Sequence, residues 1–150
     1  LALSLDVAVV IVCVCLLLLV GLVGFQSYVK SAKINRAKAD TAALALAVAQ
    51  YAYDMENTYP NYTPSQCLPV NLADLENQKE GKGPWLSGNA IKKSGTSYLD
   101  PWGNAYVYIH GNGNDGRFVV YSKGPDGNGT LSIVGVASSN GIGASGGFSK

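Results

Sequence analysis

The feature that most constrains this chain is a long run without charge near its N-terminus. No charged residue occurs between Asp6 and Lys30, so residues 7–29 are uncharged, and most of them are Val, Leu or Ile. A helix needs about 20 apolar residues to cross the hydrocarbon core of a bilayer. We therefore expect residues 1–29 to form an apolar helix that spans a membrane or packs among other apolar helices.

Two other interpretations of this run fit less well. A cleavable signal peptide has an apolar region of about 7–15 residues, which is shorter than this run, and here the chain continues directly into a helical pattern. A buried core helix of a soluble protein rarely contains 18 or more consecutive uncharged apolar residues. A membrane span is favoured, and both alternatives stay open at this stage.

The helical pattern continues beyond the apolar run. Leu44, Val48, Tyr51 and Met55 recur at intervals of four, three and four residues, which places them on one face of a helix. Alanine, the best helix former, is frequent in the same region. Pro60 cannot continue a helix and restricts the residue before it. We expect one continuous helix, apolar over residues 1–29 and amphipathic over residues 30–57.

A group of basic residues lies just after the apolar run. We call these residues the basic collar. They either bind anionic lipid headgroups or form a helix face exposed to solvent, and the sequence does not favour either interpretation. The group consists of Lys30, Lys33, Arg36 and Lys38.

Residues 58–150 have the pattern of a small globular head. Residues 105–109 and 117–121 are short β-favouring runs, and the Gly- and Asn-rich stretch 110–116 predicts a hairpin between them. Residues 130–136 are a candidate third strand. The fold class predicted for the whole chain is therefore α+β, with a long N-terminal helix packed against a small antiparallel sheet.

Other parts of the head have weaker patterns. Leu72 to Gln78 is predicted to form a short helix that Asn71 caps. Residues 137–150 are rich in Gly and Ser and have little apolar surface to bury, so we expect a loose or surface-draped tail.

Several kinds of chemistry are not supported. The string Gly111 to Gly116 matches GxGxxG, but it leads into a predicted strand, whereas a dinucleotide site requires a helix there. His110 is the only histidine, and no nucleophile–base–orienter set can be assembled, so we predict that the protein is not an enzyme. The net charge of +1 gives no excess of cations for binding nucleic acid. The three cysteines have neither zinc-site spacing nor a disulfide framework.

The loop from Asp126 to Thr130 spaces oxygen-bearing side chains two residues apart, as calcium loops do. It is not an EF-hand, because Leu131 and Ala137 occupy the positions that require Gly and Glu. A plain Gly/Asn turn is favoured over a looser calcium loop, and both remain open.

Two features of the apolar run suggest a role beyond anchoring. Asp6 is a carboxylate in the first turn, where the helix dipole favours an anion. It is either an interfacial charge or a partner for the positive N-terminal amine of a neighbouring copy. Gly21 and Gly24 each cost about 1 kcal/mol relative to Ala in a helix interior. They are either glycines tolerated in a membrane helix or a point where the helix can loosen.

Taken together, these residues resemble a known family. The apolar helix with one early acid, the Tyr59-Pro60 pair, the string Asp-Pro-Trp-Gly-Asn at 100–104 and the string Tyr-Ser-Lys-Gly-Pro-Asp-Gly at 121–127 are similar to the type IV pilin superfamily. The major pseudopilin of type II secretion systems is the most similar member. The resemblance covers the chain up to about residue 130.

The resemblance implies a structural subunit. Such proteins are made as prepilins, cut and N-methylated by a prepilin peptidase, and stored in the inner membrane. An ATPase-driven platform then assembles many identical subunits into a helical filament, either a periplasmic pseudopilus or an extracellular type IV pilus. The alternative within the superfamily is a minor pilin or membrane-tethered binding module that caps a filament or captures a substrate.

The resemblance also implies roles for particular residues. Asp6 would neutralise the N-terminal amine of an adjacent subunit, which is that of Leu1 in this numbering. The family's acid is usually Glu at the fifth mature position, so we expect either a mature start at Ala2 or a different pairing geometry. Gly21 and Gly24 would take the place of a helix-loosening proline. Calcium would bind the backbone of Lys123 and the side chains of Asp126 and Asn128.

Overall fold

The computed structural model describes residues 4–132 and 141–147. The chain divides into two compact units, Leu1–Lys33 and Ile34–Lys150, and each is considered by itself.

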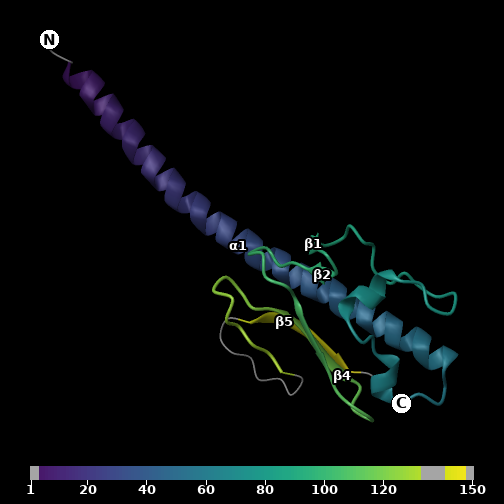
Figure 1. Ribbon diagram of the computed structural model, residues 1–150. Helices are drawn as coiled ribbons and strands as arrows, with labels where there is room; N and C mark the ends of the chain where they lie inside the picture. The colour runs from purple at the N-terminus through teal and green to yellow at the C-terminus, as the bar shows by residue number, and fades with distance from the viewer. Residues whose placement is uncertain (1–3, 133–140, 148–150) are drawn as a thin grey trace. The chain divides into compact units, whose positions relative to one another are not determined.

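Helix α1 runs from Leu5 to Thr58 without interruption (Figure 1). It begins after Ser4, whose carbonyl oxygen accepts a hydrogen bond from the Val7 amide at 2.9 Å. It ends two residues before Pro60, as the sequence predicts. The expectation of a single helix that continues from the apolar run into the head is confirmed.

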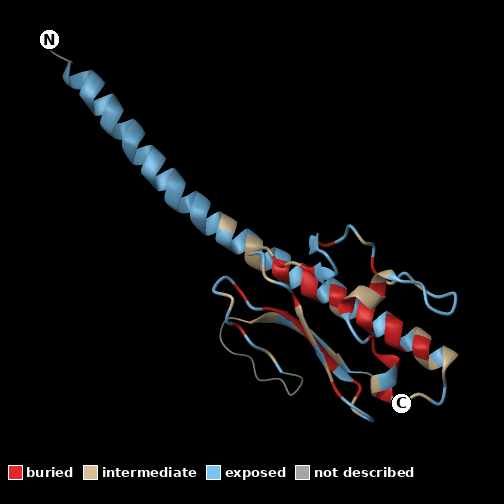
Figure 2. Cartoon of the chain, viewed as in Figure 1, coloured by how far each residue is buried: buried red, intermediate tan, exposed pale blue. Residues whose placement is uncertain are grey.

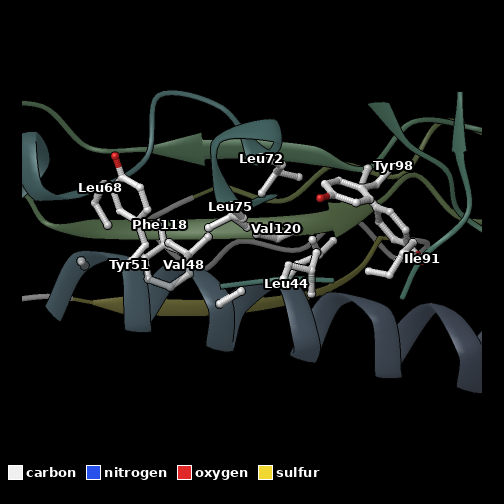
Figure 3. Packing of buried hydrophobic residues seen from close by; sticks show 14 of the residues in the cluster. Leu44, Val48, Tyr51, Leu68, Leu72, Leu75, Ile91, Tyr98, Phe118 and Val120 are labelled. Atoms are coloured by element: carbon white, nitrogen blue, oxygen red, sulfur yellow. The ribbon is translucent and has the colours of Figure 1, made fainter. Parts of the chain in front are cut away.

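The second unit is organised around one face of α1. The side chains of Leu44, Val48 and Met55 have no exposed surface, and Tyr51 is 5 % exposed. Figure 3 shows Leu44, Val48 and Tyr51 projecting from α1 into a cluster with Leu75 and with residues of strand β4. The face predicted from the spacing of apolar residues is therefore the face that builds the core.

A three-stranded antiparallel sheet completes this core, in the order β3-β4-β5. Strand β3 is Val107–His110, β4 is Arg117–Ser122 and β5 is Ile142–Gly147. Val107 pairs with Tyr121, and His110 pairs with Phe118. The predicted hairpin is confirmed, and Tyr106, just before β3, and Tyr108, within it, contact the core.

The prediction of a loose tail is wrong for residues 142–147, because they form β5 along the whole of β4. Glycine makes this strand possible: a side chain on Gly146 would place its Cβ only 2.5 Å from the ring of Phe118. The Phe118 ring on β4 thus covers the bare backbone of β5 at Gly146. This contact supplies the apolar burial that the side chains of the tail lack. The candidate third strand at residues 130–136 is not confirmed. Residues 130–132 are not in a strand, and residues 133–136 lie outside the described part of the chain.

The connection between α1 and β3 is irregular but well packed. It contains the 3-10 helices η1, Pro64–Cys67, and η2, Leu72–Glu76, followed by the two-residue strands β1, Lys93–Ser94, and β2, Ser97–Tyr98. The predicted short helix is confirmed as η2, and the Asn71 amide donates to the Asp74 carboxylate at 3.1 Å. Glu76 ties the β1–β2 hairpin to η2, because it accepts hydrogen bonds from Lys93 and from the Tyr98 hydroxyl.

Candidate functional site

The most unusual surface of the protein is the apolar part of α1. Every side chain from Ser4 to Tyr28 is exposed (Figure 2). An 18-residue window here has a mean hydropathy of 3.3, and none of it is buried. Among the described residues, α1 is the one helix long and apolar enough to cross a membrane. An apolar surface of this extent requires a cover of lipid or of other apolar helices.

Asp6 lies in the first turn of α1 and is exposed. The amides of the first helical turn lack partners within the helix, so a carboxylate in this turn is electrostatically favoured. Leu1, whose amine is the other member of the predicted pair, lies outside the described residues. The pairing of Asp6 with an N-terminal amine therefore stays a prediction.

Among the described residues, none packs closely against the Cα of Gly21 or Gly24. A methyl group added at either position would meet no atom within 4 Å. The helix is continuous through both residues. Their role as a point where the helix loosens stays a prediction.

The two strings that carry the family resemblance are joined by a buried carboxylate. Asp100 is 3 % exposed, and one of its oxygens accepts hydrogen bonds from the Trp102 amide at 3.0 Å and the Asn104 amide at 2.8 Å. The other oxygen accepts the Ser122 hydroxyl at 2.6 Å, and Ser122 Oγ in turn accepts the Gly124 amide at 3.0 Å. The Asp100–Ser122 link therefore fastens the turn before β3 to the loop after β4.

That loop, residues 123–129, is closed by its own backbone. The Gly129 amide donates to the Lys123 carbonyl at 2.7 Å, and the Asn128 amide donates to the Asp126 carboxylate at 3.1 Å. Calcium takes six to eight oxygen ligands, usually with several carboxylates. Asp126 is the last acidic residue of the sequence, so Lys123, Asp126 and Asn128 do not by themselves fit a calcium site. The calcium site that the resemblance implies would need ligands beyond these three residues.

One member of the basic collar has an interaction inside the head. Arg36 pairs with Asp40 at 2.9 Å and donates to the Ala90 carbonyl at 3.2 Å. Asp40 is buried and also accepts the Tyr106 hydroxyl at 3.0 Å. Burial, together with this carboxylate, raises the pKa of the Tyr106 hydroxyl. Lys30 and Lys38 are exposed, and binding of the collar to lipid headgroups stays a prediction.

Sequence reasoning did not single out Asp40 or Ser122. The spacing of four residues between Arg36 and Asp40 on a helix was an available signal for their ion pair. No local pattern indicates that a tyrosine 66 residues away completes the group.

The remaining motifs have structural explanations. The glycine-rich string joins β3 to β4 as a turn, in which the Gly111 amide donates to the Arg117 carbonyl at 2.9 Å. Hydrogen bonds from Arg117 lower the pKa of Asp115 in this turn to about 2. His110 Nδ1 lies 2.8 Å from the Gly111 carbonyl. Across the described ranges, no three His, Cys, Asp or Glu side chains come together as a metal site.

Residues 25–132 match the profile of the family described as Type II secretion system (T2SS), protein G. The chain belongs to this family. Its members are the major pseudopilins of the type IV pilin superfamily, so the resemblance inferred from the sequence is confirmed. The matched range includes the core-forming part of α1 and both strings joined by Asp100 and Ser122. Neither a curated protein nor a solved structure matches the chain.

The family assignment fixes the general role of this pseudopilin. It is a structural family of the secretion system and not an enzyme family, and its members assemble into a multi-subunit pseudopilus. The apolar part of α1 fits anchoring in the inner membrane.

Proposed function

We propose that this chain is the subunit that polymerises, as many identical copies, into the helical pseudopilus of a type II secretion system. The observation that carries the proposal is the combination of the family match over residues 25–132 with a fully exposed apolar helix segment before the head. A segment that is exposed all round in one chain is suited to burial among copies of itself. Burial of apolar surface contributes about 25 cal/mol per Å².

The apolar segment would serve first in the inner membrane and later in the filament. A prepilin peptidase would process the precursor, and an ATPase-driven platform would move the subunit from lipid into a periplasmic filament. Both environments are apolar, so the transfer requires no new solvation of the segment. Gly21 and Gly24, at which an added side chain would meet no described atom within 4 Å, are the positions at which the helix would adjust during the transfer.

Asp6 would neutralise the N-terminal amine of an adjacent subunit. An unpaired charge inside a bundle of apolar helices is strongly unfavourable, and the amine and the carboxylate would each remove this cost for the other. Changing Asp6 to Ala should leave membrane insertion intact and reduce filament yield, while Asp6→Glu should retain a large part of it. Normal assembly of the alanine variant would remove the pairing role. Intact-mass analysis of filament subunits would show whether Leu1 or Ala2 carries the methylated amine.

The polymer itself is tested by imaging. The full chain should be expressed with a type II secretion assembly platform, and sheared material should be examined by electron microscopy. We expect filaments that bind antibody against this chain along their whole length. Labelling at one end only would indicate the minor-pilin alternative, and monomers at every expression level would contradict polymerisation.

A further inference from the structure

The head contains a polar hollow that none of the roles discussed so far uses. It has a volume of about 430 Å³ and lies between residues 70–74, residues 96–98, Tyr106 and Tyr108. Three segments that are distant in the sequence therefore meet around one space, beside η2 and the strands β2 and β3. Sites for small molecules typically have volumes of about 300–1,000 Å³, so this hollow is large enough to hold one.

Two tyrosines form fixed walls of the hollow. Tyr98 is 2 % exposed and Tyr106 is 7 % exposed. The hydroxyl of Tyr98 donates to the Glu76 carboxylate, and that of Tyr106 donates to the Asp40 carboxylate at 3.0 Å. Both hydroxyls are thus engaged within the head and both rings are covered. A hollow with such walls is already formed before a ligand arrives, which lowers the cost of ordering it on binding.

A third tyrosine in the lining has an unsatisfied hydroxyl. The hydroxyl oxygen of Tyr108 is buried and has no hydrogen-bond partner in the part of the chain that the structure describes. Buried polar groups in native proteins nearly always have a partner. Burial, with Tyr51 and Asp74 nearby, raises the pKa of Tyr108, so its hydroxyl stays protonated and can both donate and accept. A ligand in the hollow, or a water that the ligand holds there, would supply the missing partner.

The same hollow contains a carboxylate with spare capacity. Asp74 Oδ2 accepts the Asn71 amide at 3.1 Å, whereas Oδ1 has no hydrogen-bond partner within residues 4–132 and 141–147. Thr96 and Ser97 add two exposed hydroxyls to the lining. No Lys or Arg of the described ranges lines the hollow. The groups open to a ligand are therefore one charged acceptor and several hydroxyls.

These groups favour one class of ligand. An anion would be repelled by Asp74. A cation held by aromatic residues needs open ring faces, and the rings of Tyr98 and Tyr106 are buried. A neutral ligand rich in hydroxyl groups can donate to Asp74 and exchange hydrogen bonds with the hydroxyls of the lining. Val70, which is 80 % exposed at the rim, offers apolar contact to the C–H groups of such a ligand.

We propose that this hollow binds a sugar unit of a neutral carbohydrate. Asp74 accepts hydrogen bonds from the hydroxyls of the sugar, and the Tyr108 hydroxyl pairs with the sugar or with a water that it holds. The site belongs to a single head, so it does not depend on the proposed polymerisation. A filament would repeat the site in every copy, and a polysaccharide would then bind the filament more tightly than it binds one subunit.

Saturation-transfer NMR tests the binding of sugars. The full chain should be kept in a polyoxyethylene detergent, because that detergent has no sugar headgroup. The probes are maltose, cellobiose, lactose and chitobiose, with choline as a cation of the competing class. We expect saturation transfer to the ring protons of at least one disaccharide and none to choline. Transfer to none of the disaccharides, or to choline alone, would overturn the proposal.

Two substitutions locate the bound sugar. Tyr108→Phe removes only the hydroxyl and should weaken binding about fivefold, while the midpoint of thermal unfolding stays the same or rises, because the hydroxyl has no partner to lose. Asp74→Asn keeps an acceptor for the Asn71 amide and should weaken binding at least about tenfold. Tyr62→Phe, the same change outside the hollow, is the control and should leave the affinity unchanged.

Each variant can contradict the site. Near-ultraviolet circular dichroism would show that the heads are folded. Unchanged affinity in folded Tyr108→Phe or folded Asp74→Asn would overturn the proposal, as would an equal loss in Tyr62→Phe. A lower unfolding midpoint in Tyr108→Phe would show that the hydroxyl has a structural role instead. Filament formation by the unmodified chain, measured separately, tests polymerisation and leaves this result unaffected.

Discussion

The Asp100–Ser122 link makes a quantitative prediction about the stability of the head. Changing Ser122 to Ala removes a 2.6 Å hydrogen bond to a buried carboxylate and also removes the acceptor of the Gly124 amide. A hydrogen bond to a charged group contributes about 1.5–3 kcal/mol, and a buried amide left without an acceptor adds about 1 kcal/mol or more. We expect the free energy of unfolding to fall by about 2–4 kcal/mol, a large part of the roughly 5–15 kcal/mol available to a domain.

The assay is equilibrium urea unfolding of the full chain in detergent, followed by tryptophan fluorescence. Trp102 donates its amide to Asp100, so its emission reports on the same turn. Thermal unfolding should show a midpoint lower by about 8–16 °C, at roughly 4 °C per kcal/mol. Ser87→Ala is the matched control, because Ser87 is exposed and its side chain should contribute less than about 0.5 kcal/mol.

A double-mutant cycle shows whether the effect belongs to the link. Asp100→Ala should cost more than Ser122→Ala, because it also removes the acceptor of two amides. The two changes together should cost at least about 1 kcal/mol less than their sum. A Ser122→Ala variant that unfolds within about 0.5 kcal/mol of the Ser87→Ala control would refute the reasoning, as would strict additivity.

Three further predictions follow from other contacts. Gly146→Val should destabilise the head by more than about 2 kcal/mol in the same urea assay, because the new side chain would overlap the ring of Phe118, whereas Ser145→Val on the exposed side of β5 should change little. Hydrogen bonds from Lys93 and Tyr98 lower the pKa of Glu76. The stability that ionised Glu76 contributes to the head is therefore fully present above the ordinary glutamate pKa of about 4.3, and it is lost as pH falls through the lower folded-state pKa. Glu76→Gln should therefore flatten the loss of stability on the acid side of a pH titration. Because the loop 123–129 closes through its own hydrogen bonds, 1 mM calcium should raise the midpoint of thermal unfolding by less than about 1 °C over chelator.

Each of these has an outcome that contradicts it. Equal effects of Gly146→Val and Ser145→Val would mean that β5 does not pack under the Phe118 ring. If the stability of Glu76→Gln falls at acid pH as steeply as that of the unmodified chain and of the Glu56→Gln control, the contact between η2 and the β1–β2 hairpin is not a source of pH dependence. A rise of several degrees with calcium would show that the ion binds, and that residues beyond Lys123, Asp126 and Asn128 complete its site.

The features predictable from sequence are those set by local periodicity and by proline. The spacing of Leu44, Val48, Tyr51 and Met55 identifies the core face of α1, and Pro60 identifies its end, because both depend on neighbours within a few residues. The β3–β4 hairpin follows from alternation on either side of a glycine-rich turn. The family strings were visible for the same reason, since each is a short contiguous segment.

The features that escaped prediction depend on contacts between distant segments. Nothing in the composition of residues 142–147 indicates a strand, because the burial that supports it comes from Phe118 on β4. The joining of Asp100 to Ser122 across 22 residues is likewise visible only once the two strings fold together.

The measurement that tests the central claim most directly is a helical reconstruction of filaments assembled from the full, unmodified chain. We predict that residues 5–29 of many copies form a continuous bundle along the filament axis. A filament in which these segments lie away from one another, or a preparation in which the chain remains monomeric in the membrane with the assembly platform active, would contradict the account.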